Sequence, residues 1–146
     1  MAAREMKKQD TEQKAVHEMT AVERAATERH FARCEATPSI RCKVSGNGSD
    51  LQIELDHPDE QTGQARMMDA LASADGYFVS GIVSQLANAN RCGQGIDERG
   101  LNFMLSVIKG IEPRDQLEAM LAAQMAAVHV TIMTFAQRRR MRKRLS

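Results

Sequence analysis

Hydrophobic spacing is most regular in the C-terminal third of the chain, where apolar residues recur close to the helical period of about 3.6 residues. The pattern extends from Glu112 to Arg140 and contains 18 consecutive residues without a charged side chain, Ala119 to Ala136. It predicts a long helix that begins at Pro113, because proline suits the first helical position. The members of the apolar pattern are Leu117, Met120, Leu121, Met125, Val128, Ile132, Met133, Phe135 and Ala136.

The uncharged stretch permits two interpretations. It has the length of a membrane span, and a basic cluster follows it as a cytoplasmic anchor would. Gln124, His129, Thr131 and Thr134 interrupt it, however, and alanine contributes little to membrane insertion. The pattern therefore favours the core helix of a water-soluble protein, with no membrane as a partner.

A second helix is predicted from residue 97 to residue 109, with Asp97 as its N-cap and Gly110 as a glycine C-cap. Its apolar residues occupy nearly every side, so we expect it at the centre of the fold. Only Ile111 and Glu112 separate it from the long helix. This short connection predicts an antiparallel helical hairpin.

The preceding segments predict two more helices and one hairpin. Asp75 caps a helix over 76–90, and a shorter helix covers 62–72. Residues 40–44 and 51–55 alternate between apolar and polar side chains around a turn-forming segment, which predicts a β-hairpin. Two strands are marginal alone, so the hairpin must pack on a helix or pair across a dimer.

The N-terminal segment 3–36 predicts a polar helix whose apolar stripe is thin, either a separate arm or a weakly packed element. The fold class is therefore mainly α: a helical bundle around a C-terminal helical hairpin, with one β-hairpin near residues 40–55. We divide the chain into an N-terminal helix or arm (1–36), a helical core domain with the β-hairpin (37–137) and a basic tail (138–146).

Composition indicates the type of hydrophobic core and the cellular compartment. The 146 residues suffice for one domain, and ten methionines with 3% aromatic residues indicate an aliphatic, adaptable core. Cys34, Cys42 and Cys92 form no disulfide framework, and the charged N-terminus lacks the apolar region of a signal peptide. Both features predict a cytoplasmic protein.

The net charge of +1 conceals a strong asymmetry. Outside the tail, 14 basic and 19 acidic side chains give a net charge of about −5. The tail carries six basic residues, Arg138, Arg139, Arg140, Arg142, Lys143 and Arg144. Such a run binds phosphates without sequence specificity, or it is a solvated end neutralised by acidic protein surface.

Several segments resemble a known family: SGIVSQLANA, the run from GQGIDERG to MAAVHV, MTFA and, at its start, LQIELDHPD. From Leu51 to Phe135 the chain resembles a family of uncharacterised small alphaproteobacterial proteins. The resemblance implies no activity, since none is assigned to that family. Its members continue past the TFA segment with more helix and a short β-prone end, whereas this chain ends in QRRRMRKRLS.

No catalytic residue, metal site or cofactor is indicated. His30, Cys34 and Cys42 lack the paired short spacings of a zinc site. His57 lies among acidic residues in a strand-to-helix turn, which explains it as well as a weak cation site would. His129, in the middle of the apolar helix, suggests a neutral hydrogen-bonded side chain or a group in an oligomer seam. The glycines after residue 92 lack the lysine and hydroxyl ending of a phosphate loop.

Two surfaces remain as candidates. The long helix has more apolar surface than one neighbour can cover, which predicts a homo-oligomer, most simply a dimer. The residues predicted at that interface are Met125, Val128, Ile132, Met133 and Phe135. The first functional hypothesis is a non-enzymatic, self-associating interaction protein, such as an accessory of a phage or mobile element. The alternative is a module that binds nucleic acid, or an acidic protein, through the basic tail.

Overall fold

The computed structural model describes residues 18–144 and divides the chain after Pro38 into two units. The described part of the first unit is helix α2 (Ala21–Ala36), none of whose residues is buried. A capping box begins it: the Thr20 hydroxyl accepts from the N–H of Glu23, whose carboxylate accepts from the N–H of Thr20. The predicted helix over 3–36 is therefore wrong for residues 18–20. Residues 3–17 lie outside the described residues.

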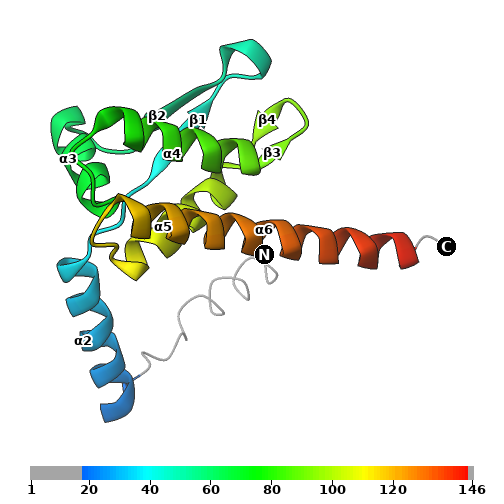
Figure 1. Cartoon of the computed structure of the whole chain (residues 1–146). Coiled ribbons are helices and arrows are strands. Elements are labelled where there is room, and N and C mark those ends of the chain that lie inside the picture. The colour runs from blue at the N-terminus through cyan, green and yellow to red at the C-terminus, as the bar shows by residue number, and fades with distance from the viewer. Residues whose placement is uncertain (1–17, 145–146) are drawn as a thin grey trace, which may run out of the picture. The chain divides into compact units, whose positions relative to one another are not determined.

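The second unit is mainly α with a β-hairpin, as predicted (Figure 1). Its elements are β1 (Cys42–Ser45), η1 (Gly48–Asp50), β2 (Gln52–Leu55), α3 (Glu60–Ala70), α4 (Gly76–Ala89), β3 (Arg91–Cys92), β4 (Gly95–Ile96), α5 (Glu98–Ile111) and α6 (Gln116–Arg144). Aspartates cap three of the helices, because Asp59, Asp75 and Asp97 each accept a hydrogen bond from a backbone N–H in the first turn. The caps predicted at Asp75 and Asp97 are thus confirmed.

The connection between α5 and α6 differs from the prediction. Helix α5 continues through Gly110 to Ile111, and the left-handed C-cap residue is Glu112, with φ 53°. Helix α6 begins at Gln116 instead of Pro113, because Asp115 accepts a hydrogen bond from the N–H of Glu118 (2.9 Å) and so caps the first turn. Proline fixes φ but supplies no capping acceptor, so the aspartate two residues later sets the boundary.

The main hairpin has the predicted position and pairs Cys42 with Leu55 and Val44 with Ile53. Its turn requires glycine at Gly46, where φ is 78° and a Cβ would lie 2.2 Å from the carbonyl oxygen of Asp50. A second, smaller hairpin, β3–β4, lies between the predicted helices 76–90 and 97–109, where no strand was predicted.

One edge of the main hairpin is covered by side chains of α5. The N–H of Cys42 donates to Asn102 Oδ1 (2.8 Å), and Asn102 Nδ2 donates to the carbonyl oxygen of Cys42 (2.9 Å). One turn earlier on the same face, Glu98 accepts from the N–H of Val44 (2.8 Å). Side chains of α5 thus form the hydrogen bonds to the backbone of β1 that a third strand would otherwise form. The hairpin therefore packs on a helix, one of the two options expected for it.

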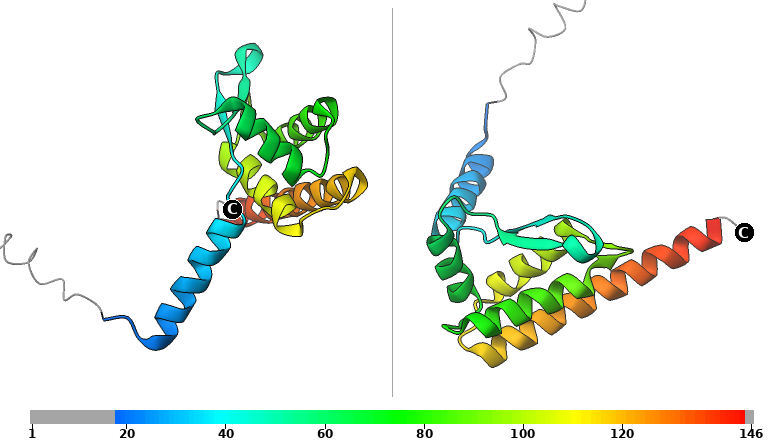
Figure 2. Two further views of the ribbon diagram at one scale, coloured as in Figure 1. Left: turned by 90° about the vertical axis from the view of Figure 1, so that its left-hand side faces the viewer. Right: turned by 90° about the horizontal axis from the view of Figure 1, so that it is seen from above.

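Helix α5 also forms the centre of the core, as predicted. Leu101, Met104, Leu105 and Ile108 are fully buried, whereas Phe103 on the opposite side is 45% exposed. Apolar residues from β1 and from α3, α4 and α6 complete the core. Viewed from two directions, α6 lies beside α4 and α5 over its first half and extends past them over its second half (Figures 1 and 2).

Candidate self-association surface

Helix α6 packs on the core through its smallest residues. Ala119, Ala122, Ala123 and Ala126 are 0 to 7% exposed and form the face that contacts α5 and α4. Alanine permits close approach of neighbouring helices, which lets one face of α6 bury a continuous row of backbone and Cβ atoms. The prediction of a core helix is therefore correct for the alanine face of residues 119–126. Residues 131–140 of the same helix are all exposed.

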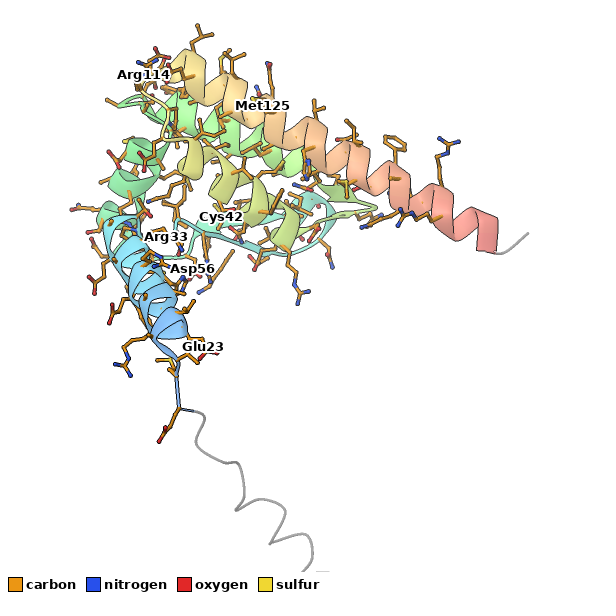
Figure 3. All side chains as sticks on the ribbon, turned by 90° about the horizontal axis from the view of Figure 1, so that it is seen from below. Glu23, Arg33, Cys42, Asp56, Arg114 and Met125 are labelled. Carbon is orange, nitrogen blue, oxygen red and sulfur yellow. The ribbon has the colours of Figure 1, made fainter. Side chains whose placement is uncertain are left out.

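The large apolar residues of α6 point to solvent instead. We define the apolar stripe as five residues that are 50 to 66% exposed: Leu121, Met125, Val128, Ile132 and Phe135. Met125 is marked on α6 in Figure 3. Such a continuous exposed row is uncommon on the surface of monomeric proteins.

The spacing within the apolar stripe is that of a coiled-coil seam. Its members follow one another at intervals of four, three, four and three residues. Since each helical residue turns by about 100°, this spacing keeps them on one line, nearly opposite the buried alanines. Within the described residues of the second unit, the other elements cover the alanine face of α6 and leave the apolar stripe exposed.

The structure divides the residues predicted at the interface. Met125, Val128, Ile132 and Phe135 belong to the apolar stripe, and Leu121 joins them although the prediction omitted it. Met133 lies seven residues after Ala126, so it continues the alanine face and is exposed because that face extends past α4 and α5. A strict search for alternating intervals of four and three would have found Leu121 and excluded Met133.

His129 is not buried and has no hydrogen bond to its side chain among the described residues, contrary to one of its two predicted roles. Its side chain is exposed, and its ring lies 5.9 Å from the ring of Phe103 on α5, centroid to centroid. It flanks the apolar stripe on the side of α5, so the predicted role in an oligomer seam stays a prediction.

The basic tail continues α6 without a break through Arg144. Arg138, Arg139 and Arg140 are exposed, while the side chains of Arg142, Lys143 and Arg144 lie outside those that the structure describes. The opposite end of α6 is acidic, with exposed carboxylates on Glu112 and Asp115. There Glu118 forms an ion pair with Arg114, which holds the pKa of the Glu118 carboxyl below its usual range.

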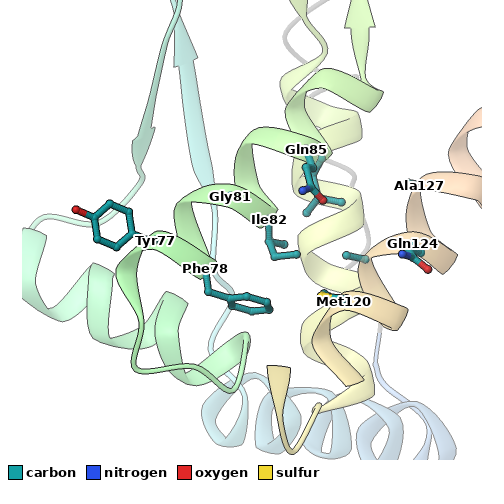
Figure 4. Close-up of a pocket in the computed structure, with 10 residues that line it drawn as sticks. Tyr77, Phe78, Gly81, Ile82, Gln85, Met120, Gln124 and Ala127 are labelled. Carbon is teal, nitrogen blue, oxygen red and sulfur yellow. The ribbon is translucent and has the colours of Figure 1, made fainter. Parts of the chain in front are cut away.

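A groove of about 390 Å³ separates α4 from α6 beside the apolar stripe (Figure 4). Phe78, Ile82 and Met120 line it, and its polar groups are Tyr77, Gln85 and Gln124. Among the described residues that line it there is no carboxylate, histidine or cysteine, and Tyr77 is the one ionisable side chain.

Of the remaining predicted site residues, Cys42 and His57 line one cavity with Glu54 and Glu60, whereas the others lie apart. His30 lies 3.6 Å from the Cys34 sulfur on α2, whereas Cys42 lies in the core of the other unit. In the turn before α3, His57 Nδ1 lies 3.1 Å from the backbone nitrogen of Asp59, so a polar turn accounts for it. Among the described residues, no three histidine, cysteine or carboxylate side chains are grouped to hold a metal ion.

Comparisons with known proteins add no constraint. The chain matches no protein-family model, no curated protein and no solved structure. The resemblance to small alphaproteobacterial proteins therefore stays a prediction. Within the described residues, one helix is long and apolar enough to cross a membrane, Gln116–Arg140, and 22% of its most apolar window is buried in the fold.

Proposed function

We propose that this chain is a non-enzymatic interaction protein that self-associates through the apolar stripe of α6. The observation that supports the proposal is the inverted packing of the helix, with alanines inside and large apolar side chains outside. A fully buried side chain of this size contributes roughly 1.5–3 kcal/mol. The stripe residues are 50 to 66% exposed in the single chain, so each would gain about half of this on pairing. The two stripes together then supply a gain of the same order as the association cost of about 4–15 kcal/mol.

A second copy suits the apolar stripe better than lipid does. A membrane-spanning helix exposes apolar surface on all sides, whereas α6 keeps its alanine face packed on α5 and α4. Gln124, Thr131 and His129 flank the stripe, and such polar side chains are disfavoured in hydrocarbon but common beside a coiled-coil seam. These two features support a protein partner in water.

The test compares two methionines of the same helix. Met125→Asp places a charge in the apolar stripe, and Met133→Asp places the same charge on the other side of α6. By light scattering at micromolar concentration, we expect the wild type and Met133→Asp to be dimers and Met125→Asp to be a monomer. Circular dichroism should show equal helicity in all three, because both methionines are exposed in the isolated chain.

Two results would contradict the proposal. If the wild type were monomeric up to 100 micromolar, the apolar stripe would not bind a second copy of the chain. Recovery of the protein in a membrane fraction that resists high salt would assign the stripe to lipid.

Nucleic-acid binding through the basic end of α6 is the second candidate function. The supporting observation is that Arg138, Arg139 and Arg140 are exposed on a helix that extends past its neighbours. Such a segment can approach phosphates closely without a clash with the rest of the unit. The test is DNA binding by a chain that lacks residues 138–146.

A further inference from the structure

We propose that the two copies pair with their α6 helices antiparallel, so that the basic end of each helix lies along the acidic start of the other. This inference rests on the proposed self-association and adds its geometry and its dependence on charge. The apolar stripe alone permits both orientations, because alternating intervals of four and three residues form a seam in either direction. The distribution of charge along α6 decides between them.

The apolar stripe forms matched layers when two copies run in opposite directions. If Met125 packs against Val128 of the partner subunit, then Leu121 packs against Ile132 of the partner subunit, and the two-fold axis repeats both contacts. Four apolar layers result, and Phe135, the last residue of the stripe, lies level with Glu118 of the partner subunit just outside them. The register also places Ala136 opposite Leu117 of the partner subunit, which is 62% exposed in the single chain.

Charge favours this orientation over the parallel one. A parallel pair would align two basic ends, each with six positive charges within nine residues, closer than the screening length of about 8 Å at physiological salt. In the antiparallel pair, the register instead places the basic end along residues 112–118 of the partner subunit, where three carboxylates outnumber the single arginine, Arg114. Glu118 is already paired with Arg114, so Glu112 and Asp115 are the carboxylates of this segment that the partner's arginines would meet.

Hydrogen bonding at the start of α6 leaves an acceptor for the partner. Asp115 Oδ1 accepts from the N–H of Glu118 (2.9 Å), and no hydrogen bond or ion pair engages its second oxygen among the described residues. An arginine guanidinium can donate to such an oxygen without breaking the cap. The acidic start therefore keeps its own helix-capping role while it receives the partner's basic end.

Disulfide cross-linking between introduced cysteines tests the orientation. In a background with Cys34→Ser and Cys92→Ser, Leu121→Cys and Ile132→Cys are made in separate chains, one of which carries a tag that changes its mass. The buried Cys42 is retained. Under mild oxidation, we expect a mixture of the two chains to form the mixed disulfide dimer at least tenfold faster than either chain forms a disulfide with itself.

The outcomes distinguish this inference from the proposed function. Fast self-cross-linking of each chain alone, without preference for the mixed dimer, would show parallel helices: self-association would stand and the inference would fall. Light scattering of the reduced variants confirms that each is still a dimer. A monomeric wild type would overturn both.

Charge reversal supplies an independent measurement on a surface variant that keeps its fold. We expect Arg138→Glu, Arg139→Glu and Arg140→Glu together to raise the dimer Kd by tenfold or more at 100 mM salt, because the reversed charges face the partner's carboxylates. The control Arg41→Glu reverses an exposed charge just before β1, away from α6, and should change Kd less than threefold. In a parallel pair the triple variant would remove repulsion and lower Kd, which would overturn the inference.

Discussion

At the scale of single residues, the burial of Cys42 in β1 lowers the reactivity expected of its thiol. Its side chain is 1% exposed, and Asn102 engages both its backbone groups. Burial, reinforced by the charge of Glu98, raises the pKa of the Cys42 thiol to about 11 from an ordinary value of 9.0. A nucleophilic cysteine needs the opposite, a lowered pKa and access to solvent.

We therefore predict that Cys42 is unreactive in the native protein. In a Cys92→Ser chain at pH 8, a thiol reagent should modify the exposed Cys34 quickly and Cys42 only after unfolding. The pKa in the folded state exceeds that of the unfolded state, so folding retains a proton between pH 9 and 11. The free energy of unfolding should accordingly decrease as pH rises through this range, and less so in Cys42→Ser. Equal reaction rates of both thiols in the native protein would contradict the prediction.

At the scale of elements, two helical glycines have opposite surroundings. A Cβ added to Gly81, in the middle of α4, would meet no atom within 4 Å, whereas one added to Gly63 in α3 would lie 2.8 Å from Cβ of His57. Glycine inside a helix costs about 0.5–1 kcal/mol relative to alanine. Gly81 lines the exposed groove beside α6, and the surrounding structure leaves room for a larger residue at this position.

We predict that Gly81→Ala raises the free energy of unfolding by about 0.5–1 kcal/mol and that Gly63→Ala lowers it by about 1–3 kcal/mol. Urea denaturation followed by circular dichroism measures both. A loss of stability in Gly81→Ala at concentrations where the protein is a dimer, but not when dilute, would show that the partner approaches this groove. Equal effects of the two substitutions would contradict the surroundings described for them.

From the sequence, the starts of α4 and α5 could be predicted more accurately than the contacts made by each helix face. Asp75 and Asp97 cap their helices as expected, because capping depends on residues within one turn. The face of α6 that packs inward could not be chosen from periodicity, which showed two apolar faces of similar weight. Hydrophobicity favoured the large residues as core, yet close packing against α5 selects alanine. The β3–β4 hairpin was missed because two-residue strands leave almost no periodic pattern.

At the scale of the whole molecule, opposite charges gather at the two ends of α6, and the body of the chain is mildly acidic. The basic end is the part that a polyanion would attract, while the net charge of +1 gives little attraction at long range. If the antiparallel pairing holds, DNA phosphates and the partner's carboxylates compete for the same arginines. Nucleic-acid binding and self-association would then oppose each other.

This competition leads to the last prediction, which concerns DNA. If six basic side chains contact phosphates, log K for DNA plotted against log salt should have a slope of about −5. A chain without residues 138–146 should lose this binding, because the rest of the protein carries a net charge of about −5 and repels the duplex. Fluorescence anisotropy with a labelled duplex measures both quantities.

The stripe variant Met125→Asp supplies the matched control for that measurement. It keeps all six basic residues and, as a monomer, frees them from the partner's carboxylates, so we expect it to bind DNA more tightly than the wild type. Equal affinity of the truncated and full-length chains would exclude the basic end as the binding segment. Equal affinity of Met125→Asp and the wild type would show that DNA and the second copy use different parts of α6.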